Sequence, residues 1–208
     1  MGRAKRIFTT EFPFHVVQRG HDRAPVFRER LDFLRFIRIL EHTRELIPVK
    51  IFSFCLMTNH FHLVLQSVED GENVSRFMRD LTSTYCRYFN ALYHRRGTLW
   101  EGRFRASLIT NDEYLLACNR YVELNPIRAG IASRLSEYPW TSYHHRSGKH
   151  CVSWLAEDPC YARLAVSLEQ RQKCYEVWMK KNVPADEILN IQRSIRRDKP
   201  IGPTAPKI

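Results

Sequence analysis

The feature that most constrains the fold is an apolar run from Ile51 to Leu65 that is interrupted by Thr58-Asn59 and carries two histidines two residues apart. Thr58-Asn59 has the composition of a tight turn, so the run predicts a β-hairpin. Side chains on a strand alternate between its two faces. We therefore expect His60 and His62 on one face of the hairpin and Phe61 in a core on the other.

The chain on either side of this hairpin alternates between strand and helix patterns. Strands are predicted where β-formers run between turn residues, and helices where apolar residues recur every three or four positions. The predicted elements are strand 12–19, helix 28–46, strands 49–57 and 60–66, helix 74–93, strand 103–109 and helix 110–124. Thr110 and Glu113 match a capping box for the last helix, which Pro126 should stop. The first six elements predict an α+β fold with a ferredoxin-like, four-stranded antiparallel sheet and two helices on one face.

The order of elements is less clear beyond Gly130. Helical spacing recurs at 168–181 and 185–197, and the end at 199–208 contains Pro and Gly, which is typical of a loose tail. We therefore divide the chain into a domain of residues 1–145 and a C-terminal helical extension with its tail, residues 146–208.

The charge of the chain points to a polyanionic partner. Its 208 residues carry a formal net charge of +11 with a pI near 9.6, which is typical of nucleic-acid-binding proteins. Arginines and aromatic residues are interleaved in one stretch, where arginine could hold phosphates and aromatic rings could stack on unpaired bases. The candidate DNA contacts are Arg19, Arg76, Arg79, Arg87, Arg95, Arg96, Arg103, Arg105 and Trp100.

Localisation is predicted from what the sequence lacks. The N-terminal residues contain basic side chains but no apolar segment typical of a signal peptide, and no apolar run is long enough to cross a membrane. The six cysteines are far apart without a C-x-x-C pair, which favours reduced thiols over disulfides or a cysteine-based zinc site. We expect a cytoplasmic protein with no membrane partner.

A second group of residues could complete a reactive site with the histidine pair. Tyr121 and Asn125 are four residues apart and share one face of the last predicted helix. If that face lies over the sheet, the Asn125 amide oxygen could join His60 and His62 around a weakly held Mg²⁺ or Mn²⁺. Tyr121 would then present its phenol oxygen to a substrate phosphate, where a metal ion would offset its poor nucleophilicity at neutral pH.

These residues carry a family resemblance. The stretches 55–66 (CLMTNHFHLVLQ), 97–109 (GTLWEGRFRASLI) and 114–130 (YLLACNRYVELNPIRAG) resemble the HUH single-tyrosine transposases, and more narrowly the REP-associated tyrosine transposases related to insertion-sequence enzymes. PFHVVQRGHDR near the start and YPWTSY later in the chain fit the same family. The resemblance covers about residues 12–143, and Y-x-x-x-N-P-x-R-A-G is its most specific element.

The resemblance implies an HUH endonuclease-type fold and a mechanism. His60 and His62 match the family's metal-binding pair, Tyr121 matches its nucleophile, and Asn125 matches its polar third ligand. In the family the tyrosine attacks single-stranded DNA, forming a 5′-phosphotyrosine link and a free 3′-hydroxyl, and the reversed step rejoins a strand. The DNA recognised is typically a hairpin beside a short guide sequence.

Other interpretations stay open at this stage. The chain could be a structure-specific DNA-binding protein without catalysis, or an HUH nickase of the replication-initiator or relaxase type. A metallohydrolase with zinc-bound water is disfavoured because no third strong ligand is evident. His15, His21 and Tyr114 are weaker candidates, for which hydrogen bonding, exposure or packing is the expected role. Monomer and homodimer are both possible.

Overall fold

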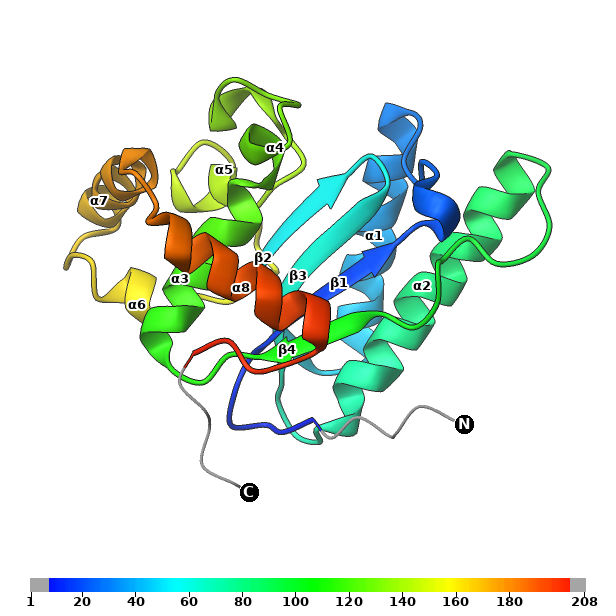
Figure 1. The fold of residues 1–208 in the computed structure, drawn as a ribbon, viewed down its shortest axis with the longest axis horizontal. Coiled ribbons are helices and arrows are strands. Elements are labelled where there is room, and N and C mark those ends of the chain that lie inside the picture. Colours follow the sequence, from blue (N-terminus) through cyan, green and yellow to red (C-terminus); the bar gives the residue numbers. More distant parts are fainter. Residues whose placement is uncertain (1–7, 203–208) are drawn as a thin grey trace.

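The computed structural model describes residues 8–202 and is centred on one antiparallel sheet (Figure 1). The strands are β1 (Phe14–Arg19), β2 (Val49–Met57), β3 (His60–Ser67) and β4 (Arg105–Leu108). Their order across the sheet is β2-β3-β1-β4, and every neighbouring pair is antiparallel. This is the ferredoxin-like sheet that the sequence predicted. The β2–β3 hairpin turns at Thr58-Asn59 as expected, whereas β4 is shorter than the predicted strand 103–109.

The helices divide between the two faces of the sheet. One face is covered by α1 (Arg30–Leu46) and α2 (Glu72–Leu92). The other face and the neighbouring space hold the remaining helices, which lie apart from α1 and α2 in Figure 1. These are α3 (Asp112–Glu123), α4 (Asn125–Arg128), α5 (Tyr143–Arg146), α6 (Pro159–Ala162), α7 (Leu168–Lys180) and α8 (Ala185–Arg197), with short 3₁₀ turns η1 (His21–Arg23) and η2 (Leu135–Glu137).

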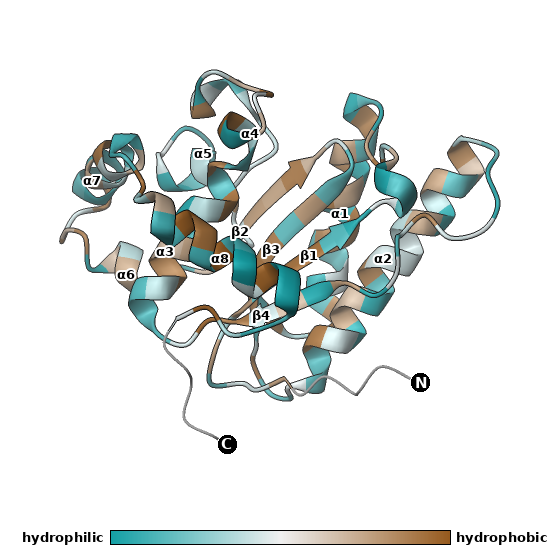
Figure 2. Cartoon of the chain, viewed as in Figure 1, coloured by the Kyte–Doolittle hydropathy of each residue, from teal (hydrophilic) through white to brown (hydrophobic). Residues whose placement is uncertain are grey.

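Two apolar cores form because side chains alternate along the strands. Phe61 and Leu63 are fully buried in the core beneath α1 and α2, as predicted for the face opposite the histidines. The second core joins the sheet to α3 and α8 and includes Val64, Val122 and Ile195. Figure 2 shows hydrophobic residues along β2, β3 and α8. The second core therefore places α3 over the histidine-bearing face.

The start of α3 differs from the predicted capping box. Asn111 is the N-cap, and its side-chain oxygen accepts a hydrogen bond of 2.9 Å from the backbone N–H of Tyr114. The Thr110 hydroxyl instead donates to the carbonyl oxygen of Ile201 at 3.1 Å. A tertiary contact from a distant part of the chain thus engages the hydroxyl that local sequence assigned to the cap.

The C-terminal part of the chain covers both edges of the sheet. Ile201 forms a parallel bridge with Ile109 beside β4, and the β2 edge receives Thr141 through a bridge to Cys55. Ala156 also donates its backbone N–H to Ile51 at 2.8 Å. These contacts satisfy edge groups that would otherwise be open to another strand. Of the tail predicted at 199–208, residues 199–202 lie against β4, and 203–208 fall outside the described residues.

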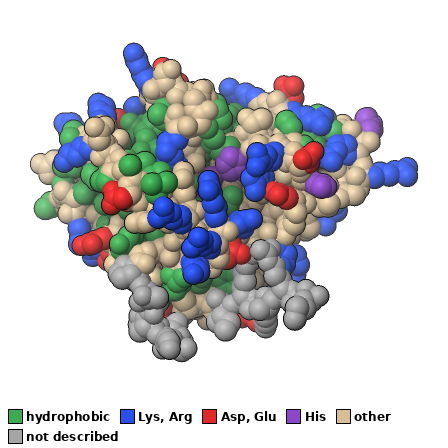
Figure 3. Space-filling view, in the orientation of Figure 1, with side chains coloured by type: hydrophobic (Ala, Val, Ile, Leu, Met, Phe, Trp, Pro, Cys, Tyr) green, Lys and Arg blue, Asp and Glu red, His purple; other side chains and the backbone are tan. Residues whose placement is uncertain are grey.

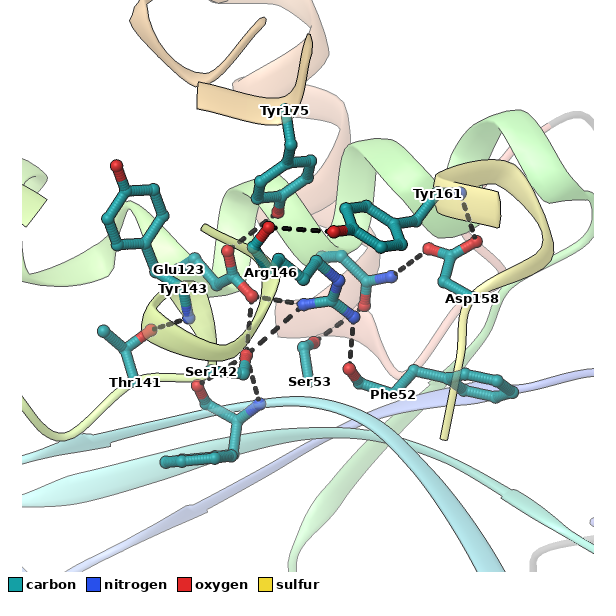
Figure 4. A network of polar contacts seen from close by, with 12 residues as sticks. Phe52, Ser53, Glu123, Thr141, Ser142, Tyr143, Arg146, Asp158, Tyr161 and Tyr175 are labelled. Atoms are coloured by element: carbon teal, nitrogen blue, oxygen red, sulfur yellow. Dashed lines mark hydrogen bonds and ion pairs between the residues drawn. The ribbon is translucent and has the colours of Figure 1, made fainter. Parts of the chain in front are cut away.

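A buried polar network fixes α3 to the sheet and to α7 (Figure 4). Glu123, at the end of α3, forms an ion pair with Arg146 and accepts hydrogen bonds from Ser142 at 2.6 Å and Tyr175 at 2.7 Å. Arg146 also donates to the carbonyl oxygen of Phe52 in β2. Arg146 lies at the predicted boundary between the two parts of the chain, so this boundary region is closely packed against the helix that carries Tyr121.

Candidate active site

The structure brings the four predicted reactive residues around one cavity of about 630 Å³. His60 and His62 both face α3, with ring centroids 4.9 Å apart, as the strand alternation predicted. The ring centroid of Tyr121 lies 6.2 Å from that of His62, and Asn125 lines the same cavity. Tyr121 is 8 % exposed and lines the cavity.

The hydrogen bonds of His60 leave one ring nitrogen suited to a metal ion. Its Nδ1 lies 2.6 Å from the side-chain oxygen of Asn59, which can only accept, so Nδ1 carries the proton and Nε2 keeps its lone pair. Burial, with a smaller contribution from the charge of Arg19, lowers the pKa of His60 to about 4. Burial also lowers the pKa of His62 well below its usual value. Both imidazoles are therefore neutral at pH 7, the form that binds metal ions.

His15 stands directly behind His62, which sequence analysis did not anticipate. Its Nε2 lies 2.9 Å from His62 Nδ1, and the two rings are stacked with centroids 5.1 Å apart. Burial, aided by the charge of Arg128, lowers the pKa of His15 to about 3, so the contact joins two neutral rings. The expected role of His15, a hydrogen-bonded histidine, is confirmed, but its partner is the candidate ligand itself. The missing signal was the register that pairs β1 with β3.

Asn125 begins α4 and lines the cavity. Its Nδ2 donates to the carbonyl oxygens of Tyr121 and Val122, each at 3.2 Å. Its Oδ1 accepts from Arg128 at 2.9 Å, and an amide oxygen has a second lone pair for a cation. Two imidazole nitrogens and one amide oxygen fit a loosely held Mg²⁺ or Mn²⁺ with open positions. Within residues 8–202 no cluster of three or more His, Cys, Asp or Glu side chains is arranged to hold a metal ion.

The phenol of Tyr121 is enclosed by two charged or polar neighbours. Burial raises the pKa of Tyr121, and the positive charge of Arg128 opposes this shift. The guanidinium carbon of Arg128 lies 3.8 Å from the centroid of the Tyr121 ring. The side chain of Gln192 in α8 also interacts with the hydroxyl. The nucleophile candidate thus sits between a stacked cation and the C-terminal helix.

Comparison with known proteins decides the family. The family model for IS200-like transposases matches residues 8–125, more than half of the chain. This chain belongs to the IS200-like transposase family. The matched segment includes β1 to β4, α3 and Asn125. It therefore contains the four candidate reactive residues, which are His60, His62, Tyr121 and Asn125.

Two relatives resemble this transposase more narrowly. A Haemophilus influenzae protein described as a REP-associated tyrosine transposase is 28 % identical over 114 residues, which are 50 % of this chain and 64 % of that protein. This chain thus matches less than two thirds of the length of the Haemophilus influenzae protein. A solved REP-associated tyrosine transposase bound to a REP hairpin has the same fold, with a TM-score of 0.58 and 17 % identity, covering 76 % of this chain and 93 % of that one.

Part of the predicted DNA surface surrounds the cavity of the transposase. Arg19, Arg103 and Arg105 line it together with Arg23 and Arg196, and Glu101 is the one acidic residue in its lining. Figure 3 shows Lys and Arg side chains gathered on this face around a histidine. Glu101 accepts from Arg19 at 2.6 Å, which leaves the cavity strongly basic.

The other predicted DNA contacts lie elsewhere. Arg76, Arg79 and Arg87 are exposed on α2, on the opposite side of the sheet, and Arg95 and Arg96 follow that helix. Trp100 is 8 % exposed and belongs to the core beneath α2, where its indole N–H donates to the carbonyl oxygen of Thr82 at 3.0 Å. The structure therefore gives Trp100 a packing role rather than a free stacking face.

Among residues 8–202 no helix is long and apolar enough to cross a membrane.

Proposed function

We propose that this transposase cleaves and rejoins single-stranded hairpin DNA of the REP type through a 5′-phosphotyrosine intermediate on Tyr121. The observation that carries the proposal is the convergence of Tyr121, His60, His62 and Asn125 on one arginine-lined cavity. A buried phenol beside neutral imidazoles and basic side chains suits attack on a phosphodiester, which is anionic.

The proposed step conserves the number of phosphodiester-type bonds. The Tyr121 hydroxyl gives up its proton to solvent, and its oxygen forms a bond to phosphorus while the bond from phosphorus to the 3′-oxygen breaks. The released 3′-oxygen takes up a proton, so one strand ends in a free 3′-hydroxyl and the other is joined to the protein through its 5′-phosphate. Attack by a 3′-hydroxyl on the phosphotyrosine reverses the step and rejoins the DNA.

The donor set supports a divalent cation in this site. His60 and His62 would contribute Nε2 atoms and Asn125 its Oδ1, with substrate oxygens filling the open positions. A bound Mg²⁺ or Mn²⁺ would polarise the phosphate and offset charge in the transition state. The protein's own part is to hold the two neutral rings and the phenol on the same side of the cavity.

The DNA partner is inferred from charge and from the relatives. The arginines around the cavity can hold the backbone of a single strand near Tyr121. The solved transposase with the same fold is bound to a REP hairpin, which supports hairpin DNA as the class of ligand for this chain. Monomer and homodimer both remain compatible with the proposal.

The test is covalent capture of labelled hairpin DNA in Mg²⁺ or Mn²⁺. A label on the 3′ end should stay with the protein, whereas a label on the 5′ end should leave with the free 3′-hydroxyl fragment. Tyr121→Phe should abolish the conjugate. Tyr114→Phe, seven residues earlier on the same helix, is the matched control and should keep it. A conjugate that persists in Tyr121→Phe would show that another residue is the nucleophile.

One observation favours the alternative of a DNA-binding protein without catalysis. Tyr121 is almost enclosed, and α8 contacts its hydroxyl through Gln192. This alternative expects tight hairpin binding with no conjugate in either metal ion. It would also expect Tyr121→Phe to bind hairpin DNA as well as the wild-type protein does.

A further inference from the structure

Arg128 contacts both Tyr121 and Asn125. Its Nη2 donates to the Tyr121 carbonyl oxygen at 2.8 Å and to Asn125 Oδ1 at 2.9 Å, while its guanidinium lies over the Tyr121 ring. The contact arises because α4 follows α3 after the single residue Leu124, whose backbone is also helical. Seven residues make about two helical turns, which brings residue 128 back to the side of residue 121.

The charge of Arg128 is not balanced by a carboxylate. Within the described part of the chain, none of its contacts is an ion pair, and its Nη1 is buried without a hydrogen-bond partner. The ionisable side chains that raise its pKa are Tyr121 and the buried thiols Cys55 and Cys118, and its charge also acts on the neutral rings of His15 and His62. Arg128 is partly buried, and arginine stays protonated. A cation that is drawn away from water is normally paired, because desolvating it costs free energy. An unpaired cation at this place is therefore expected to serve an anion that is present only during function.

We infer that Arg128 is a positioning residue for the reaction, which holds the Tyr121 ring in place and supplies the countercharge for the phenolate and phosphate that meet there. This inference rests on the proposed function. A guanidinium stacked on a ring restricts the rotation of that ring without engaging its hydroxyl. Its fixed charge favours the charged reacting state over the neutral resting state, so it should act on the rate of attack more than on DNA affinity.

Arg120 provides a matched control on the same helix. It too is a stacked arginine, with its guanidinium carbon 4.6 Å from the centroid of the Trp178 ring, and it donates to the carbonyl oxygen of Lys181. Arg120 is buried, whereas Arg128 is partly buried. Unlike Arg128, it has a carboxylate, Glu187, among the charges that act on it, and it contacts Trp178 and Lys181 rather than Tyr121 and Asn125. Substitution at Arg120 therefore removes similar packing without touching the reactive site.

The experiment compares wild-type protein, Arg128→Met, Arg128→Lys and Arg120→Met. Hairpin affinity is measured by fluorescence anisotropy, the single-turnover rate of conjugate formation is measured at saturating DNA, and thermal unfolding is followed for each protein. Arg128→Met should slow conjugate formation about 100-fold, the scale of losing one preorganised charged donor, and change hairpin Kd by less than about 3-fold. Arg128→Lys should recover part of the rate, because it restores charge without the planar stack.

The outcomes separate this inference from the proposed function. If wild-type protein forms the conjugate and Arg128→Met forms it at the same rate, Arg128 is structural and the inference is overturned. If wild-type protein forms no conjugate with either metal ion present, the proposed function fails. The role of Arg128 is then decided from the thermal unfolding measurements. In that case the melting temperatures of the two Met variants are compared. If Arg128→Met lowers the melting temperature as much as Arg120→Met does, the inference is overturned. If it lowers the melting temperature clearly less, Arg128 contributes little to stability, which supports a cation kept for a functional anion.

Discussion

At the scale of single residues, the candidate ligands are oriented by partners behind them. A metal-bound histidine commonly donates its other ring N–H to a neighbour, which fixes its tautomer. Asn59 fills this role for His60, and His15 fills it for His62. His15 Nδ1 and the hydroxyl of Ser107, which are on directly paired positions of β1 and β4, are both buried without a hydrogen-bond partner in the described residues. The contact between His15 and His62 is thus kept although two buried polar groups beside it, His15 Nδ1 and the Ser107 hydroxyl, lack hydrogen bonds, which costs stability.

The first prediction concerns His15. His15→Phe should preserve the ring stack but remove the hydrogen bond that orients His62, and should weaken Mn²⁺ affinity about 10- to 100-fold. Mn²⁺ binding can be measured by electron paramagnetic resonance in the absence of DNA. His42→Phe, with an exposed side chain on α1, should bind Mn²⁺ as the wild-type protein does. Equal affinity in His15→Phe and wild-type protein would mean that His62 needs no support from β1.

Local patterns brought the four candidate residues to one cavity but did not predict their neighbours. Alternation along one strand was enough to put His60 and His62 on one face, because that relation is internal to the strand. The contact with His15 depends on how β1 pairs with β3, which local sequence does not encode. The helix ends before Pro126 as predicted, but Pro126 also occupies the first turn of a new helix, α4, where its missing N–H costs nothing. Arg128 was missed because no helix was expected after Pro126.

At the scale of elements, the buried network decides where α3 lies. Glu123 is two residues beyond Tyr121 and is fully buried, and its carboxylate contacts side chains from α5 and α7. Through Arg146 the network reaches the β2 backbone at Phe52, beside an irregularity in the β2–β3 register. Side chains from residues 146–208 therefore help to hold α3, which carries Tyr121, against the four-stranded sheet. Sequence periodicity predicted the extension's main helices, but the network joins single residues from distant elements and has no local signature.

The second prediction tests this network. Arg146→Met leaves the Glu123 carboxylate buried without its cation and should lower the free energy of unfolding by about 3–5 kcal/mol. Adding Glu123→Gln removes the charge and keeps one side-chain oxygen that can accept from Ser142 or Tyr175, which donate to different carboxylate oxygens of Glu123. The new amide NH2 can donate to the other hydroxyl. The double variant should therefore be more stable than the sum of the single effects by about 1–3 kcal/mol, measured by urea unfolding. Additive effects would contradict a coupled ion pair.

At the scale of the whole molecule, two of the surfaces that carry positive charge lie on opposite sides of the sheet. One set of arginines surrounds the cavity that holds Tyr121, and another lies on α2 across the sheet. Arg103 represents the first surface and is exposed, while Arg79 represents the second and is paired with Asp80 at 2.9 Å. Net charge alone predicts nucleic-acid binding without saying which surface the strand follows. Proximity to Tyr121, the proposed nucleophile, favours the cavity for the single-stranded part of the DNA.

The last prediction distinguishes these surfaces by salt dependence. Each phosphate contact with a single strand contributes about 0.7 to the slope of log affinity against log salt, because binding releases a counterion. Arg103→Gln should reduce the slope for hairpin DNA with a single-stranded flank by about that amount, and should have no effect with a blunt hairpin that lacks the flank. Arg79→Gln should leave the slope unchanged with both DNAs, because Asp80 already neutralises that side chain. The opposite pattern, with a lower slope only in Arg79→Gln, would place the strand on α2 and separate binding from the cavity that contains Tyr121.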